Sequence, residues 1–263
     1  MNILIVGLGV ISKKHVAAIR LHRPNAHIYA LRSNTNAAVE QGIQNIFHLD
    51  QIDFKIDFAI ISNSTHLHFE WIEKLIEIGC PLFVEKPALH TLEGADELVK
   101  KVESKGVLSY VACNFRFHPC VVFAKKLIQN EAIGKINEVN VYCGSFLPDW
   151  RPGQDFRTFY SANASMGGGV HLDLFHEFDH TYHLFGKPVK VRKTLTSNSS
   201  LKIDAIDYSN YLLEYDHFCA NVVLNYYRRK TKRTIEIVSN KDTYTVDLFE
   251  NKVVTDSGRV LFE

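Results

Sequence analysis

The sequence predicts an α/β domain with a doubly wound parallel sheet, followed by an α+β domain with an open, mainly antiparallel sheet and helices on one face. Three observations predict this order. Short apolar runs alternate with amphipathic helical segments in the first part of the chain, which is the pattern of βα units. A glycine-rich turn follows the first apolar run. From residue 189 onwards the segments are mostly strands with alternating apolar and polar residues, as in a sheet with one wet face.

Length and composition predict two domains, over residues 1–118 and 119–263. The formal charge of +1 gives no global field for nucleic acid or an anionic membrane surface, and no apolar window is long enough to span a bilayer. The five cysteines are scattered and lack CxxC spacing. We therefore expect no disulfide framework, no metal site, no nucleic-acid or membrane partner, and a reducing cytoplasm as the location.

In the first domain, strands are expected over residues 3–6, 26–31, 46–48, 57–62, 81–84 and 108–112, and helices over 10–20, 69–79 and 92–106. In the second, we expect helices over 119–129 and 170–185 and strands over 136–146, 189–196, 208–215, 219–227, 234–238 and 244–249, with a short pair near Val253 and Val260. The segment 148–166 is polar, aromatic and irregular.

The turn from Gly7 to Ser12 predicts a dinucleotide site. Gly7 allows a sharp turn, and Gly9 has no Cβ to keep a diphosphate away from the backbone. The helix that begins at Val10 and Ile11 offers free N–H groups to anionic oxygen. Ser12 replaces the third glycine of the usual pattern, and a small residue there still permits close packing of helix on strand.

The end of the second strand bears on the choice of cofactor. An acidic residue there usually accepts hydrogen bonds from the ribose of NAD, and this chain has none. Arg32 can instead pair with a 2′-phosphate, with Ser33 as a second donor. These residues favour NADP and leave NAD possible.

Glu85-Lys86-Pro87 follows a short buried strand, at the edge where ligands bind in such sheets. Pro87 biases Lys86 towards an extended conformation, so that its amine can project into a cleft. A partly desolvated lysine beside a bound cofactor can exchange protons with a substrate hydroxyl.

A second group of polar residues follows Gly167-Gly168-Gly169. On one helix, Asp173, His176 and His180 share a face that could line a cleft. Residues 176–180 also satisfy the H-E-x-x-H pattern of zinc hydrolases. That alternative leaves the glycine turn and Glu85-Lys86-Pro87 without a role.

Together, these motifs resemble the family of glucose-fructose oxidoreductase, inositol dehydrogenase and rhizopine catabolism proteins (Gfo/Idh/MocA). The motifs that carry the resemblance are Gly7-Leu8-Gly9 with His15, Ser62-Asn63-Ser64 leading to His68, Glu85-Lys86-Pro87, Asn114-Phe115-Arg116-Phe117-His118-Pro119 and the triple glycine with its helix. The resemblance implies a Rossmann domain, a second domain with an open sheet, and hydride transfer between NAD(P) and a sugar, polyol or related substrate. It also implies a homodimer or homotetramer formed through the C-terminal sheet.

By this resemblance, Lys86 is the proton-transfer lysine, Asp173 orients the substrate, and His176 assists at the reacting hydroxyl. The implied cofactor-binding residues are Gly7, Gly9, Val10, Ile11, Arg32, Ser33, Ser62, Asn63, Ser64, His68, Glu85, Lys86 and Asn114. Many members place the histidine one residue later, where this chain has Glu177, and Ser62-Asn63-Ser64 replaces a more usual Thr-Pro pairing. The chain is also expected to be C-terminally short for the family.

The irregular segment is expected to cover the substrate. Trp150 and Tyr160 can stack on a sugar face, and Arg151 or Arg157 can clamp a carboxylate or phosphate. Arg116 is a further candidate for substrate binding. The alternative to an oxidoreductase is a non-catalytic NADP(H)-binding sensor or partner subunit.

Overall fold

The chain forms two compact units, Met1–Ala112 and Cys113–Glu263. The computed structural model describes all residues, 1–263. The domain boundary expected after residue 118 follows η3 (Asn114–Phe117), a short 3-10 helix in the second unit.

The first unit contains a six-stranded parallel sheet in the order β3-β2-β1-β4-β5-β6. Its strands are β1 (Asn2–Val6), β2 (His27–Leu31), β3 (Ile43–Ile46), β4 (Phe58–Ile61), β5 (Leu82–Val84) and β6 (Ser109–Val111). The chain order reverses between β1 and β4, where the carboxyl ends of the strands border the usual ligand crevice of a doubly wound sheet.

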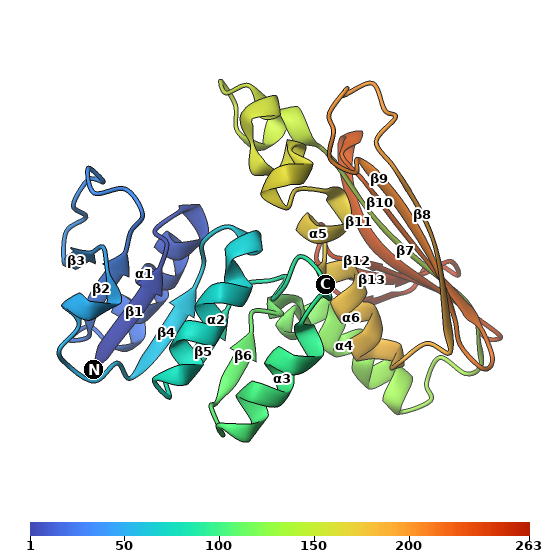
Figure 1. Cartoon of the computed structure of the whole chain (residues 1–263). Helices are drawn as coiled ribbons and strands as arrows, with labels where there is room; N and C mark the ends of the chain where they lie inside the picture. Colours follow the sequence, from blue (N-terminus) through green and yellow to red (C-terminus); the bar gives the residue numbers. More distant parts are fainter. The chain divides into compact units, whose positions relative to one another are not determined.

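Helices cover both faces of this sheet (Figure 1). Ile3 and Ile5 of β1 pack on one face with Ile19 of α1 (Val10–His22). Leu4 of β1 packs on the other face with Leu75 of α2 (His68–Glu77) and with α3 (Ala95–Ser104). Alternate residues of a strand point to opposite faces, so the apolar run at the start of the chain is buried on both sides. Two 3-10 turns, η1 (Leu49–Gln51) and η2 (Thr65–Leu67), complete the unit.

The second unit contains an eight-stranded sheet in the order β14-β13-β12-β11-β7-β10-β9-β8. All neighbours are antiparallel except β7 and β10. The strands are β7 (Ile136–Phe146), β8 (Lys190–Thr196), β9 (Tyr208–Glu214), β10 (Cys219–Asn225), β11 (Tyr227–Ser239), β12 (Thr243–Asp247), β13 (Lys252–Thr255) and β14 (Val260–Phe262).

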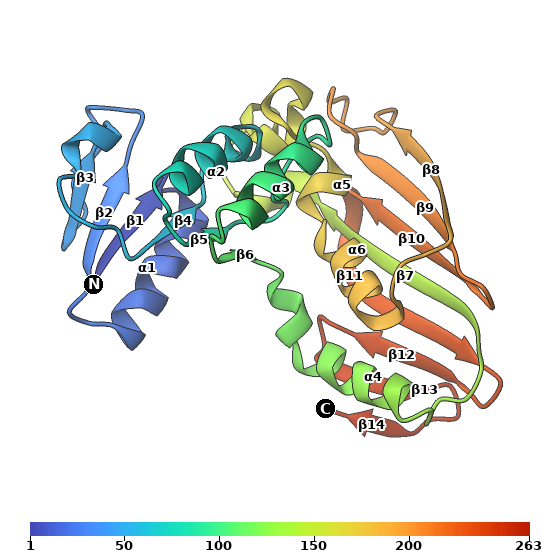
Figure 2. The ribbon, with the colours of Figure 1, turned by 60° about the horizontal axis from the view of Figure 1, so that its bottom comes forward.

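One face of this sheet is covered by α4 (Pro119–Gln129), α5 (Val170–Asp173) and α6 (His176–Phe185), as Figure 2 shows. Alternate residues of β7, such as Val139 and Val141, form the core beneath these helices with Val121 of α4 and Leu184 of α6. The predicted fold class is therefore confirmed for both units. The irregular segment consists of four 3-10 turns: η4 (Leu147–Trp150), η5 (Phe156–Thr158), η6 (Tyr160–Ala162) and η7 (Ala164–Met166).

Three expected elements differ from those observed. The third strand ends at Ile46 instead of beginning there, because residues 43–46 pair with β2. The helix expected over 170–185 is divided into α5 and α6 at Leu174, whose ψ of 36° is not helical. The strand expected over 234–238 is the second half of β11, which extends back to Tyr227.

None of the helices combines the length and the apolar character that a membrane span requires.

Candidate functional site

In the first unit, nearly all of the predicted cofactor-binding residues follow the carboxyl ends of neighbouring strands. Because parallel strands present these ends at one edge of the sheet, the structure brings this set together. The groups are Gly7 to Ile11 after β1, Arg32 and Ser33 after β2, Ser62 to Ser64 and His68 after β4, and Glu85 and Lys86 after β5. Asn114 is the exception, since it lies at the start of the second unit.

The glycine turn leaves open space beside the start of α1. Gly7 adopts a φ of +81°, and a Cβ there would meet the Cβ of Asn63 at 2.8 Å, so only glycine fits. Gly9 is extended, and a Cβ there would meet nothing within 4 Å. The space in front of Gly9 is therefore open. Val10 and Ile11 begin α1 and are exposed, and the first N–H groups of a helix have no partner within it.

Glu85 connects the loop of Lys86 to helix α1. Nε2 of His15 donates to Oε1 of Glu85 at 2.7 Å, and Oε2 of Glu85 accepts from the backbone N–H of Lys86 at 3.2 Å. Burial by itself raises the pKa of the Glu85 carboxyl, but the hydrogen bond and charge of His15 bring its net pKa below the usual value. Lys86 is half-buried directly after β5, and its peptide bond to Pro87 is cis. The motif thus holds Lys86 beside an anchored carboxylate.

His68 joins two loops of the same edge. Its Nδ1 lies 3.1 Å from the carbonyl oxygen of Pro87, and its Nε2 lies 3.2 Å from that of Asn63. Burial lowers the pKa of His68, which favours the neutral ring. His68 is therefore buried between the loop after β4 and the loop after β5, and the single N–H of its neutral ring donates to one of the two carbonyl oxygens.

Arg32 is half-buried at the end of β2, and Ser33 beside it is exposed. Nη1 of Arg32 donates to the side-chain oxygen of Asn45 at 3.5 Å. This partner is a neutral amide, and a guanidinium at this strand end suits an anionic ligand.

In the second unit, Asp173 is held by an aromatic cluster. The hydroxyl of Tyr226 donates to Oδ2 of Asp173 at 2.5 Å, and Tyr226 is fully buried. Burial and the charge of Asp173 raise the pKa values of both Tyr226 and Tyr160 well above the ordinary range. The Trp150 ring stands edge-on to Tyr226 at 5.4 Å, and its indole N–H donates to Oγ of Ser145 at 3.0 Å. Sequence analysis missed Tyr226, because a buried tyrosine between two strands gives no motif.

The triple glycine brings the irregular segment against α5. A Cβ on Gly168 would lie 2.0 Å from the carbonyl oxygen of Tyr160 and 2.7 Å from that of Asn163. Backbone can therefore approach this closely only at a glycine. This contact places the η6 turn, which carries Tyr160, next to the helix that carries Asp173.

The face expected for Asp173, His176 and His180 is interrupted, because the helix breaks after Asp173. His176 packs against the ring of Phe115 at 4.7 Å. His180 is fully buried and does not line a cleft.

Glu177 is also fully buried and accepts from Nε and Nη2 of Arg233, at 2.5 and 3.2 Å. Burial alone raises the pKa of Glu177, but His180 and Arg233 outweigh it and lower the pKa to about 2. A carboxylate bound in this way cannot serve as the general base that the zinc-hydrolase pattern requires.

Three arginines proposed to contact substrate have partners inside the second unit. Arg116 makes a forked pair with the buried carboxylate of Asp179, with contacts of 2.6, 3.0 and 3.1 Å. Arg151 lies over the Phe159 ring at 4.5 Å, and Arg157 lies over the Phe156 ring at 4.5 Å. Nη1 of Arg157 also donates to Oδ1 of Asp155 at 3.4 Å, and the remaining N–H groups of the two stacked guanidinium groups are of the kind that binds an anion.

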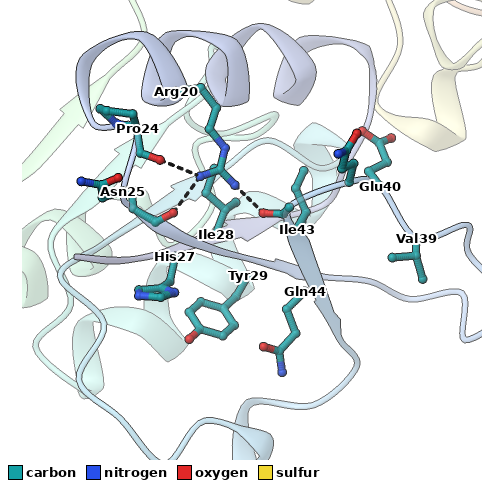
Figure 3. Close-up of a pocket in the computed structure, with 13 residues that line it drawn as sticks. Arg20, Pro24, Asn25, His27, Ile28, Tyr29, Val39, Glu40, Ile43 and Gln44 are labelled. Atoms are coloured by element: carbon teal, nitrogen blue, oxygen red, sulfur yellow. Dashed lines mark hydrogen bonds between the residues drawn. The ribbon is translucent and has the colours of Figure 1, made fainter.

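A surface hollow of about 720 Å³ lies away from the glycine turn, at the amino-terminal ends of β2 and β3 (Figure 3). Its cation is Arg20, whose guanidinium donates to the carbonyl groups of Ala26 at 2.8 Å, of Pro24 at 3.4 Å and of Gly42. Arg20 thus connects α1 to the segments that lead into β2 and β3. Its guanidinium N–H groups donate to backbone oxygens of these segments.

Two family models match the chain. An oxidoreductase family model with an NAD-binding Rossmann fold (Gfo/Idh/MocA) matches residues 1–113, and a C-terminal domain model of the same family matches residues 121–245.

Among curated proteins, the chain is 28% identical over 177 residues to the NADP⁺-dependent scyllo-inositol 2-dehydrogenase IolW of Bacillus subtilis, covering 65% of this chain and 46% of that protein. It is 30% identical over 147 residues to levoglucosan dehydrogenase of Pseudarthrobacter phenanthrenivorans, covering 55% and 37%. It is 29% identical over 209 residues to the uncharacterised oxidoreductase YhhX of Escherichia coli, covering 75% and 57%. The chain thus spans about half the length of the curated relatives that it matches.

Among solved structures, levoglucosan dehydrogenase in complex with NADH and levoglucosan has a TM-score of 0.84 at 22% identity, covering 100% of this chain and 79% of that one. The WlbA dehydrogenase of Bordetella pertussis, in complex with NADH and UDP-GlcNAcA, has a TM-score of 0.84 at 21% identity, covering 100% and 77%. At these identities the similarity shows the fold.

Proposed function

The chain belongs to the Gfo/Idh/MocA family of oxidoreductases, and from that premise we propose that it transfers a hydride between NADP(H) and a secondary alcohol or ketone of a sugar, polyol or sugar derivative. The observation that carries this proposal is the glycine turn. The open space at Gly9 and the N–H groups at the start of α1 fit a diphosphate. Relatives that act on inositol and levoglucosan support the substrate class.

The preference for NADP over NAD rests on the end of β2. Arg32 and Ser33 supply a cation and a hydroxyl there, and no carboxylate competes for the ribose. The relatives include both an NADP⁺-dependent and an NAD⁺-dependent scyllo-inositol 2-dehydrogenase of Bacillus subtilis. In our proposal, Arg32 and Ser33 at this strand end therefore determine the preference for NADP over NAD.

Bound NADP supplies the hydride acceptor or donor at its nicotinamide ring. In our proposal, the neutral amine of Lys86 takes the hydroxyl proton when the alcohol is oxidised and returns it when the ketone is reduced. Asp173 orients the substrate as a hydrogen-bond acceptor, in a position that Tyr226 helps to hold. His176 assists at the same hydroxyl, and its ring is supported by Phe115.

Substrate contacts are assigned to the aromatic segment. We propose that Trp150 and Tyr160 pack against the sugar ring and that Arg151 and Arg157 bind a carboxylate or phosphate when the substrate has one. Arg116 contributes a guanidinium that its pairing with Asp179 holds in place. The open sheet of the second unit is proposed as the surface for a homodimer or homotetramer.

The alternative function is that of a non-catalytic NADP(H)-binding sensor or partner subunit. The observation that favours it is Glu177, which stands where many members have histidine and is bound to Arg233 in the core.

Purified protein would be titrated with NADPH and NADH by fluorescence, and then assayed for NADP⁺ reduction with scyllo-inositol, myo-inositol, levoglucosan and a panel of sugar acids and sugar phosphates. We expect binding of NADPH and turnover with at least one polyol or sugar. Binding without turnover of any compound in either direction supports the sensor, and absence of dinucleotide binding rejects both proposals.

A further inference from the structure

Ser12, at the third position of the glycine pattern, makes more contacts than a small packing residue needs. Its side chain is fully buried. Its Oγ accepts from the backbone N–H of Gly9 at 3.1 Å, and lies 3.1 Å from the carbonyl oxygen of Gly7 and 2.9 Å from Oγ of Ser62. One hydroxyl thus touches the end of β1, the start of α1 and the end of β4.

Ser62 brings the loop after β4 into the same cluster. Its backbone N–H donates to the carbonyl oxygen of Val6 at 3.1 Å, and its buried Oγ also lies 3.4 Å from that oxygen. The next residue, Asn63, is packed so closely on Gly7 that no side chain fits between them. The glycine turn and the loop after β4 are therefore in direct contact, with the two hydroxyl groups at their junction.

One assignment of protons satisfies the three contacts of Ser12. Ser62 donates to Oγ of Ser12, Ser12 donates to the carbonyl oxygen of Gly7, and the N–H of Gly9 donates to Oγ of Ser12. Both lone pairs and the single proton of Ser12 are then used. The N–H of Gly9 is consequently withdrawn from any ligand, which leaves the N–H groups of Val10 and Ile11 as the donors at the start of α1.

We propose that Ser12 and Ser62 form a positioning pair for the dinucleotide. The pair holds the turn in the shape that presents Val10 and Ile11 to the diphosphate, and it couples this turn to the loop of Asn63. This inference rests on the proposed function, and assigns to Ser12 a task that glycine or alanine, the usual residues at its position, cannot perform. A turn held in its binding shape before the ligand arrives loses less entropy on binding.

The test measures the affinities of NADH, NADPH and ADP-ribose for wild type, Ser12→Ala, Ser62→Ala and the double variant. Ser12→Ala leaves the N–H of Gly9 and the hydroxyl of Ser62 without their partner, and we expect all three ligands to bind about 10-fold more weakly. ADP-ribose keeps the diphosphate and lacks nicotinamide, so an equal loss for it places the effect at the diphosphate. Ser62→Ala keeps the Gly9–Ser12 contact and should lose less, and the double variant should bind no more weakly than Ser12→Ala alone.

Ser209→Ala, which removes an equally buried hydroxyl from the second unit, is the matched control, and circular dichroism at the titration temperature confirms that each variant is folded. Unchanged affinity in folded Ser12→Ala overturns the inference and leaves the proposed function standing. A loss for NADH and NADPH without a loss for ADP-ribose also overturns it, as does strict additivity of the two substitutions. If wild type binds none of the ligands, the proposed function fails first and the inference fails with it.

Discussion

In the first unit, substitution of a single residue should change cofactor affinity without changing the stability of the fold. Gly9 offers the clearest case, since its backbone has φ −93° and ψ −165°, which any residue can adopt, and no atom lies within 4 Å of a Cβ built there. Gly9→Ala should change the free energy of unfolding by less than about 0.5 kcal/mol. The added methyl group occupies the approach of the diphosphate, so NADPH affinity should fall at least about 10-fold. Thermal melts and NADPH titrations of the same preparation check this, and wild-type affinity in the variant contradicts it.

Lys86 is expected to affect chemistry without affecting cofactor binding. If its amine transfers the substrate proton, Lys86→Ala should lower turnover by about 10²- to 10⁴-fold. NADPH affinity should remain nearly unchanged, because the glycine turn is intact. Lys74→Ala on the exposed side of α2 serves as the control for removing a lysine from this unit. A Lys86→Ala protein that binds NADPH weakly but turns over normally once bound would count against the proton-transfer role.

The residues that sequence analysis found and missed differ in a physical way. Gly7, Gly9 and Lys86 lie in local motifs, because a turn or a strand end positions them through their own neighbours in the chain. Tyr226 and Arg233 act through partners 53 and 56 residues away, and no short pattern records such contacts. The sequence indicates only that Ser12 is small, whereas its hydrogen bond to Ser62 spans 50 residues.

At the scale of elements, prediction succeeded where burial alone decides the structure. The run from Ile3 to Val6 is buried on both faces, and its neighbours in the sheet follow the same rule. The helix over 119–129 was also correct, since Pro119 and the apolar spacing define its start and its packed face. The division between α5 and α6 could not be predicted, because the helical periodicity continues through Leu174. Asp173, the last residue of α5, accepts from Tyr226, and this contact across 53 residues forms only in the folded unit.

The pair formed by Glu177 and Arg233 connects α6 to β11, and it yields a prediction for this junction. Arg233→Met should destabilise the second unit by about 3–5 kcal/mol, because it leaves the fully buried carboxylate of Glu177 without its guanidinium. The double variant Glu177→Gln/Arg233→Met removes both charges and should recover most of that loss. Urea denaturation of both variants measures this difference. Equal instability of the single and the double variant would show that packing of Arg233 over Phe115, at 4.2 Å, outweighs its charge.

At the scale of the whole molecule, the two units have separate cores but share one electrostatic feature, which is a set of buried and half-buried histidines with lowered pKa values. Burial is the largest cause that lowers the pKa of His68 in the first unit and of His118, His171 and His183 in the second, from a usual value of 6.5. In the unfolded chain these rings titrate near 6.5. Between that pH and their lower values in the folded protein, the unfolded state therefore binds more protons than the folded state.

This difference sets the sign of the pH dependence. Stability from the neutral histidines is fully present above about pH 6.5 and is lost as the pH falls from there towards their folded pKa values. Glu85 and Glu177 have lowered pKa values, so their contribution is lost only below about pH 4.5. We therefore expect the melting temperature to fall as the pH is lowered from 7 to 5.5, before protonation of the carboxylates contributes. Calorimetry over that pH range measures the melting temperature. His68→Gln removes one of these rings and should flatten the fall for the first unit, whereas an unchanged slope would mean that His68 is charged in the folded protein.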